Sequence, residues 1–225
     1  MAKVPGTIID NTKYDDRTSR MRFGKMKVFG GSAGGELTDE IVRYIARKDG
    51  YENFSRGELE SVTFSNENIF VKLNESVRGK DIYLVQTMAS PIHDNIMESL
   101  VTIDALKRDS AWRINLVVPY LTYTRSDKKD QPRVPITARL MANMIETAGA
   151  DRYITVDLHA GQIQGFFNIP GDALTAFHLL SEYVTKNFDL DNLVVVATDL
   201  GFAKQGRNWA EALDVPLAFV EKRRV

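Results

Sequence analysis

The sequence contains no cysteine among its 225 residues. This absence excludes disulfide bonds, thiol nucleophiles and thiolate metal sites, so any metal ligands must come from oxygen atoms and the three histidines. A hard cation such as Mg²⁺ fits that set of ligands best. An excess of one charge is also missing. The 29 basic and 30 acidic side chains give a formal net charge of −1, which argues against bulk electrostatic binding of nucleic acid or of a membrane surface.

Long apolar runs are missing too. No run approaches the roughly 20 residues of a membrane span, and the first residues lack the apolar core of a signal peptide. A cytoplasmic location is therefore expected. Two common phosphate motifs are absent as well, because the chain has no GxxxxGK[ST] and its GGSAGG turn at residues 30–35 lacks the GxGxxG spacing. These glycines are predicted to form a tight turn.

Segments of strand length alternate with segments of helical periodicity from residue 23 onward, whereas residues 1–22 show no sustained period and are predicted to be an extension. Strands are predicted at residues 27–29, 61–64, 69–73, 81–86, 114–120, 153–156, 193–198 and 217–220. Helices are predicted at residues 36–47, 94–108, 135–148, 173–186 and 203–213. The first helix should place Leu37, Ile41, Tyr44 and Ile45 on one face, and Asp94 or Asn95 should cap the second. The alternation predicts an α/β fold with a largely parallel sheet.

The segment YITVDLHAGQIQGFFNIP at residues 153–170 carries the clearest functional signal. It is a β-branched strand that ends in Asp157 and His159, and parallel sheets bind ligands beyond the carboxyl ends of their strands. The two side chains can hold a metal or a charged substrate. The alternative is that His159 is a hydrogen-bonded scaffold residue.

A basic loop follows the strand at 114–120. Arg125, Lys128, Lys129 and Arg133 stand among polar residues just before a helix, an arrangement that suits a polyphosphate. A solvated basic loop is the alternative.

Two later segments also carry candidate residues. Asp199 follows the strand at 193–198 as Asp157 follows its own strand, although it can equally cap the next helix. Lys222 and Arg224 are two residues apart on an extended segment, which points both cations to one side, as a transferring phosphoryl group requires. Simple surface charge is the alternative for that pair.

From about residue 28 to residue 224 the chain resembles the ribose-phosphate diphosphokinases, also called phosphoribosyl pyrophosphate synthetases. The matching segments are, in order, FSNENIFVKLNESVRGKDIYLVQ, DNIMESLVTIDALKRDSA, VVPYLTYTRSDKKD, PITARLMANMIETAGAD, TVDLHAGQIQGFFNIP and EKRR. The resemblance implies two phosphoribosyltransferase-like α/β domains in tandem, here at residues 23–170 and, incomplete, at 171–225. It also implies homo-oligomers such as hexamers, and Mg²⁺-dependent transfer of the diphosphoryl group of ATP to the 1-hydroxyl of ribose 5-phosphate.

Site residues are implied by the same resemblance. The adenine segment is represented by Phe64, Asn66 and Asn68, and the second ATP segment by Arg125, Ser126 and Asp127. The metal positions are Asp157, His159 and Asp199, and the basic pair at the transferring diphosphate is Lys222 and Arg224. Arg78 matches a position tied to regulation by phosphate.

The chain departs from the family pattern at several of these segments. Asn68 stands where an acid is usual, Ser126 where Gln is usual, and Asn168 where Asp is common. Gly161 replaces a frequent Ser, and Gly201-Phe202 replaces Gly-Gly. The family's acidic loop for ribose 5-phosphate would lie beyond Val225. Two hypotheses therefore stand, an active diphosphokinase and a non-catalytic nucleotide-binding or regulatory homologue that associates with a full-length synthetase.

Overall fold

A computed structural model describes residues 24–48 and 50–220 of the chain. Its internal contacts divide the chain into two compact units, Met1–Leu174 and Thr175–Val225. Residues 171–174 belong to the first unit because they pair with its sheet, and the two domains expected at residues 23–170 and 171–225 stay a prediction. No helix in the described part of the chain is long and apolar enough to cross a membrane.

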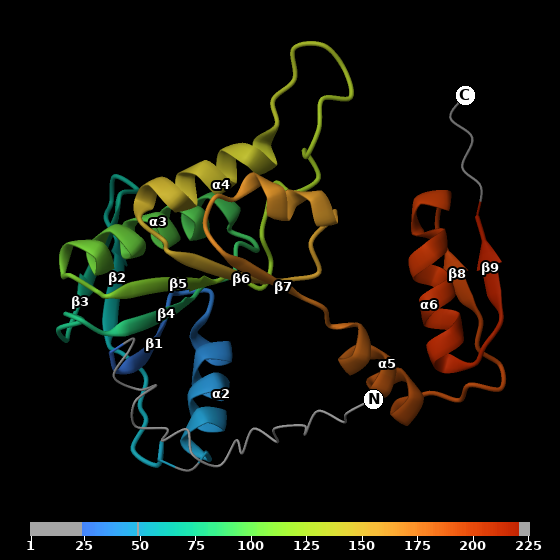
Figure 1. The fold of residues 1–225 in the computed structure, drawn as a ribbon, viewed down its shortest axis with the longest axis horizontal. Coiled ribbons are helices and arrows are strands. Elements are labelled where there is room, and N and C mark those ends of the chain that lie inside the picture. Colours follow the sequence, from blue (N-terminus) through green and yellow to red (C-terminus); the bar gives the residue numbers. More distant parts are fainter. Residues whose placement is uncertain (1–23, 49, 221–225) are drawn as a thin grey trace, which may run out of the picture. The chain divides into compact units, whose positions relative to one another are not determined.

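The first unit is built on a five-stranded parallel sheet (Figure 1). Its strand order is β1-β4-β5-β6-β7, and all four pairings between neighbours are parallel. The strands are β1 (Met26–Gly30), β4 (Asp81–Val85), β5 (Arg113–Val117), β6 (Arg152–Val156) and β7 (Gly171–Leu174). The predicted α/β fold with a parallel sheet is confirmed. All carboxyl ends of these strands consequently lie along the same edge.

Helices lie on both faces of this sheet. In Figure 1, α3 (Ile92–Arg108) and α4 (Thr137–Ala148) lie together on one face, and α2 (Gly35–Ala46) lies on the other. The apolar side chains of α3 and α4 pack on the central strands. Leu84 of β4, Leu116 of β5 and Ile145 of α4 are fully buried in this contact. The packing holds the strands from whose ends the loops emerge.

A separate antiparallel hairpin consists of β2 (Leu59–Thr63) and β3 (Ile69–Leu73). Val71 is buried, while Leu59 and Leu73 pack against the main core, so one face of the hairpin is anchored to the unit. β3 lies against α3. The other face carries the residues that alternate with these and is exposed to solvent.

The GGSAGG segment forms the predicted tight turn between β1 and α2. Gly34 donates its backbone N–H to the carbonyl of Gly31, at 3.1 Å. A Cβ added at Gly34 would lie 2.0 Å from the carbonyl oxygen of Val85, so no side chain fits there.

The apolar face predicted for α2 is only partly buried. Leu37 and Tyr44 are exposed, and the one fully buried residue of the helix is Thr38. Thr38 satisfies its hydroxyl by donating to the carbonyl of Gly34, at 2.6 Å. The periodicity identified the helix, but hydrogen bonding within the first turn allowed a polar side chain to face the sheet.

Two other element predictions are corrected. α3 begins at Ile92 with Pro91 at its N-cap position and no side-chain cap, so neither Asp94 nor Asn95 caps it. Asn95 is buried inside the helix and donates its amide to the carbonyl of Ala89, at 2.8 Å. The helix predicted at 173–186 begins only at residue 177, because residues 171–174 form β7 beside β6.

The second unit is small. It contains α5 (Phe177–Asn187), β8 (Val195–Ala197), the 3-10 turn η3 (Leu200–Phe202), α6 (Ala203–Leu213) and β9 (Leu217–Phe219). β8 and β9 pair in parallel, and α6 packs on them through buried Ala210 and Leu213. No residue of α5 is buried.

Candidate functional site

The end of β6 presents the first two candidate ligands. Asp157 follows the strand directly in the left-handed region, with φ of 48°, and its backbone N–H donates to the carbonyl of Leu174 at 2.9 Å. A non-glycine residue in this region is uncommon and is found at turns and functional sites. Asp157 and His159 are both exposed at the carboxyl edge of the sheet. Their position is the one that the sequence predicted.

The loop after β5 emerges at the same edge. Tyr123 also lies in the left-handed region, with φ of 60°, and its carbonyl accepts the N–H of Ser126 at 3.2 Å. The loop is tied to both neighbouring strand ends, because Met88 donates to the carbonyl of Tyr120 at 3.1 Å and Val156 to that of Pro119 at 3.2 Å. This turn holds Arg125 exposed at the sheet edge.

A side-chain hydrogen bond joins the two segments. Gln162, in the short 3-10 helix η2 (Gly161–Phe166), donates its amide to Asp127 Oδ2 at 2.7 Å. Asp127 is only 8% exposed. Its carboxylate therefore orients the loop, while the Arg125 side chain two residues earlier is exposed. Sequence reasoning missed Gln162, although it belongs to the same DLHAGQIQGFF segment and could have been found there.

Ser126 closes the base of the basic loop. Its hydroxyl lies 3.3 Å from the carbonyl oxygen of Pro135 and accepts the N–H of Thr137, the first residue of α4, at 3.4 Å. Ala138 donates its N–H to the Ser126 carbonyl at 3.1 Å. Residue 126 is thus used within the chain to connect the loop to α4. A glutamine side chain, usual in the family pattern, is longer and has no hydroxyl at this position to make these two contacts.

The hairpin carries the predicted adenine segment at its turn. Phe64 donates its N–H to the carbonyl of Asn68 at 2.9 Å, and Asn68 donates its N–H to Asn66 Oδ1 at 3.2 Å. The ring of Phe64 is 51% exposed and contacts the ring of Phe70, with 5.9 Å between ring centroids. The segment therefore offers aromatic surface and amide groups to solvent.

The remaining candidates are distributed over the chain. Arg78 is exposed beside the turn that precedes β4. Asp199 lies in the second unit, where it caps η3 and its Oδ1 accepts the N–H of Phe202 at 3.2 Å. The helix-cap alternative considered for Asp199 is therefore realised, which leaves its metal role a prediction. Lys222 and Arg224 lie outside the described residues.

Within residues 24–48 and 50–220 no three His, Asp or Glu side chains gather into a metal cluster. Asp157 and His159 can supply two ligands to a cation. Mg²⁺ retains several water molecules and is commonly held by one or two carboxylates together with substrate phosphates. The exposed Asp157 carboxylate at a strand end fits that mode of binding, and His159, two residues later, is the second candidate ligand.

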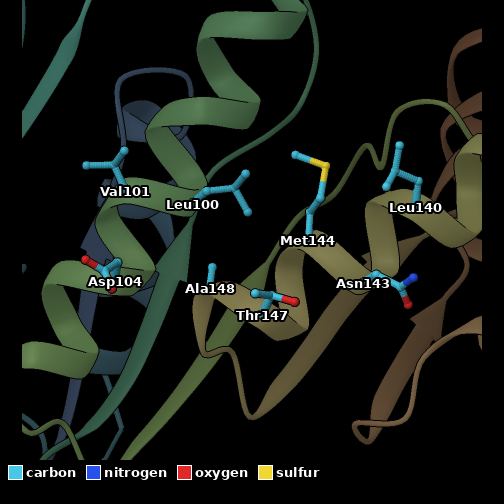
Figure 2. Close-up of a pocket in the computed structure, with 8 residues that line it drawn as sticks. All are labelled: Leu100, Val101, Asp104, Leu140, Asn143, Met144, Thr147 and Ala148. Carbon is cyan, nitrogen blue, oxygen red and sulfur yellow. The ribbon is translucent and has the colours of Figure 1, made fainter.

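The structure also has a groove away from these residues. It lies between α3 and α4, has a volume of about 530 Å³ and contains none of the predicted site residues. Figure 2 shows its lining, which is Leu100, Val101, Asp104, Leu140, Asn143, Met144, Thr147 and Ala148. The groove is a feature of the helical face, whereas the polar candidates belong to the strand ends and the hairpin.

Comparison with known proteins identifies the family. Residues 26–149 match the model of the N-terminal domain of ribose phosphate pyrophosphokinase. The chain belongs to the ribose-phosphate pyrophosphokinase family. The ribose-phosphate pyrophosphokinase of Rhizobium meliloti is 46% identical over 199 residues, which are 88% of this chain and 62% of that protein. The corresponding protein of Clostridium perfringens is 45% identical over 201 residues, or 88% and 61% of the two chains.

A solved structure agrees with this assignment. The crystal structure of phosphoribosylpyrophosphate synthetase from Mycobacterium smegmatis matches with a TM-score of 0.81 and 41% identity, over 90% of this chain and 66% of that one. The pyrophosphokinase family and its fold are therefore established for this chain. The chain spans about 62% of the length of the Rhizobium relative.

Proposed function

We propose that the protein is an ATP-dependent ribose-phosphate diphosphokinase of nucleotide biosynthesis. In this reaction the 1-hydroxyl of ribose 5-phosphate loses its proton to solvent and its oxygen bonds to the β-phosphorus of ATP. The bond from that phosphorus to the α,β-bridging oxygen breaks, and AMP leaves. The products are AMP and phosphoribosyl pyrophosphate. One observation carries the proposal: the Asp127–Gln162 hydrogen bond holds the Arg125 loop and the Asp157/His159 segment together at one edge of the sheet.

The proposed chemistry depends on positioning and charge neutralisation and needs no protein nucleophile. Asp157 and His159 would hold Mg²⁺, and Asp199 is proposed as a further ligand. When bound, the cation neutralises charge on the diphosphate that is transferred. Arg125 would bind phosphate oxygens from the neighbouring loop, since a guanidinium donates paired hydrogen bonds to them. Lys222 and Arg224 are proposed to contact the transferring group.

Nucleotide binding is assigned to two segments. Phe64 would stack on the adenine, with Asn66 and Asn68 beside it, and stacking on an aromatic side chain contributes about 1–3 kcal/mol per base. Ser126 and Asp127 shape the second segment through the contacts described above. Arg78 is retained as a proposed position of regulation by phosphate.

The larger-scale predictions remain proposals as well. Residues 171–225 are proposed to begin a second phosphoribosyltransferase-like domain, and the protein is proposed to act as a homo-oligomer, with a hexamer implied by the resemblance. The cytoplasmic location expected from the sequence also stays a prediction.

A second candidate function is a nucleotide-binding homologue that modulates a full-length synthetase without turnover. It is favoured by position 126, where the serine hydroxyl is engaged in hydrogen bonds within the chain. Asn68, in place of an acid, changes the other nucleotide segment.

Phosphorus NMR of the chain with Mg²⁺, ATP and ribose 5-phosphate distinguishes these functions. The first predicts AMP and a new sugar diphosphate, with turnover reduced about 10²-fold or more by His159→Ala. His178→Ala is the matched control, because His178 is an exposed histidine on α5 with no proposed role. Binding of ATP without turnover would support the second candidate. A folded chain that neither binds nor converts ATP would contradict both.

A further inference from the structure

We infer that Phe70 is a positioning residue that holds the ring of Phe64 in place for stacking on the nucleobase. This inference rests on the proposed function, because it concerns the ligand of the same hairpin. The resemblance assigns no role to Phe70, and no motif in the sequence indicates one.

Phe64 and Phe70 lie on the same face of the hairpin. Val62 pairs with Phe70 in the register of β2 and β3, and the Phe64–Asn68 hydrogen bond extends that register by one pair beyond the strands. Because side chains alternate along a strand, Val62, Phe64, Asn68 and Phe70 share one face. Phe64 and Phe70 are diagonal neighbours across the two strands, a distance that aromatic side chains can span.

The two rings are in contact. The two ring centroids are 5.9 Å apart and the ring planes are tilted by 35°. Among the described residues, this is the ring contact that the structure gives for Phe64. The other face of the hairpin is anchored through buried Val71, so the strand beneath Phe70 is held against the core. Phe70 therefore supports the Phe64 ring from a fixed strand position, while Phe64 itself stands at the turn.

Both phenylalanines are exposed to solvent. Phe64 is 51% exposed and Phe70 is 47% exposed, so about half of each residue remains accessible to a ligand. By the alternation of the strands, Asn68 lies on the same face as the two rings. Exposed aromatic surface on a face that also carries an amide side chain matches the chemistry of a purine, which has two π-faces and a polar edge.

A purely structural role is the competing explanation, because cross-strand aromatic pairs also stabilise hairpins. The two roles differ in what they do to ligands. Loss of a positioning ring weakens binding of a nucleotide that carries a base and leaves binding of a bare polyphosphate unchanged. Loss of a pair that only stabilises the hairpin lowers the melting temperature and changes the affinities for the two ligands by the same factor.

The experiment is calorimetric titration of the complete chain with ATP and, separately, with inorganic tripolyphosphate, both with Mg²⁺. An aromatic pair contributes about 0.5–1.5 kcal/mol, so Phe70→Leu should weaken ATP binding about two- to tenfold and leave tripolyphosphate binding unchanged. Phe70→Tyr keeps the ring and should bind ATP as the unchanged chain does. Tyr44→Leu is the matched control, since Tyr44 is an exposed aromatic residue on α2, outside the hairpin.

The outcomes separate the inference from the proposed function. Unchanged ATP affinity in Phe70→Leu, or an equal loss for both ligands, would overturn the role of Phe70 and leave the proposed function standing. Absence of ATP binding in the unchanged chain would overturn both. Circular dichroism of each variant shows whether it is folded. Both Phe70→Leu and Phe70→Tyr keep a large side chain at position 70, so their comparison isolates the effect of the aromatic ring.

Discussion

At the residue scale, contacts within the chain explain a departure from the family pattern. Asn168 donates its backbone N–H and its side-chain amide to the two carboxylate oxygens of Glu146 on α4, at 2.6 and 2.8 Å. The aspartate that is common at this position would place a second carboxylate against Glu146 and would lack the amide donor. The sequence showed that the residue was unusual, but it could not show Glu146 opposite it, because the two are 22 positions apart.

Another residue-scale feature is the ion cluster around Glu75. Lys27 Nζ lies 3.1 Å from one oxygen of its carboxylate, and Lys80 Nζ lies 3.0 Å from the other. Burial by itself raises the pKa of Glu75, but the hydrogen bonds from Lys80 and Lys27 and the charge of Lys27 lower it more, so the pKa lies below its ordinary value.

This shift predicts how stability depends on pH. Since the folded-state pKa is lowered, the stabilisation is fully present above the ordinary pKa of 4.5 and is lost as the pH falls below it, through the folded value. We expect Glu75→Gln to lower the urea midpoint at pH 7, and the difference from the unchanged chain to shrink between about pH 5 and pH 3. A difference that stays constant over this range would contradict the assignment.

At the scale of elements, the sequence identified helices and strands better than it identified their faces and ends. Hydrophobic periodicity located α3, α4 and the central strands, whose apolar faces are buried together. It did not foresee β7, because residues 171–174 have little apolar pattern and become a strand only by pairing with β6. Pairing of this kind depends on tertiary structure and is not encoded in local periodicity.

The candidate site was predictable to a similar degree. Asp157 and His159 were located from their place at the end of a β-branched strand, and the structure puts them at the expected sheet edge. The Asp127–Gln162 bond was not predictable, because it spans 35 positions and depends on how two loops meet. The proximity of loops is set by the sheet order, which the sequence did not provide.

The turn between β1 and α2 permits a sharp test at this scale. Gly34→Ala would place a methyl group 2.0 Å from the Val85 carbonyl oxygen, which is backbone and cannot rotate away. We expect a loss of about 1–3 kcal/mol in the free energy of unfolding, as is typical of overpacking. Gly161→Ala is the matched control, because nothing lies within 4 Å of an added Cβ there. Equal stability of the two variants in urea titration would contradict the proposed close approach.

At the scale of the whole molecule, the two units differ in how far they form a core. The buried apolar cluster lies between Phe29 and Phe167, entirely within the first unit. The second unit has only a two-stranded parallel sheet among the described residues, although parallel sheets are ordinarily covered on both faces. Because the buried core belongs to the first unit, that unit can hold the strand-end residues on packed strands, as the positioning of a nucleotide and a metal ion requires.

The central claim is that a metal–nucleotide complex binds at the carboxyl edge of the sheet, at the Asp157/His159 segment and the Arg125 loop. The most direct test is the NMR spectrum of the ¹⁵N-labelled chain with ATP during titration with Mn²⁺, a paramagnetic substitute for Mg²⁺. The claim predicts that the amide signals of residues 157–160 and 122–126 broaden first, and that Asp157→Asn removes this selectivity. Broadening that begins at other residues, or that is uniform over the chain, would contradict it.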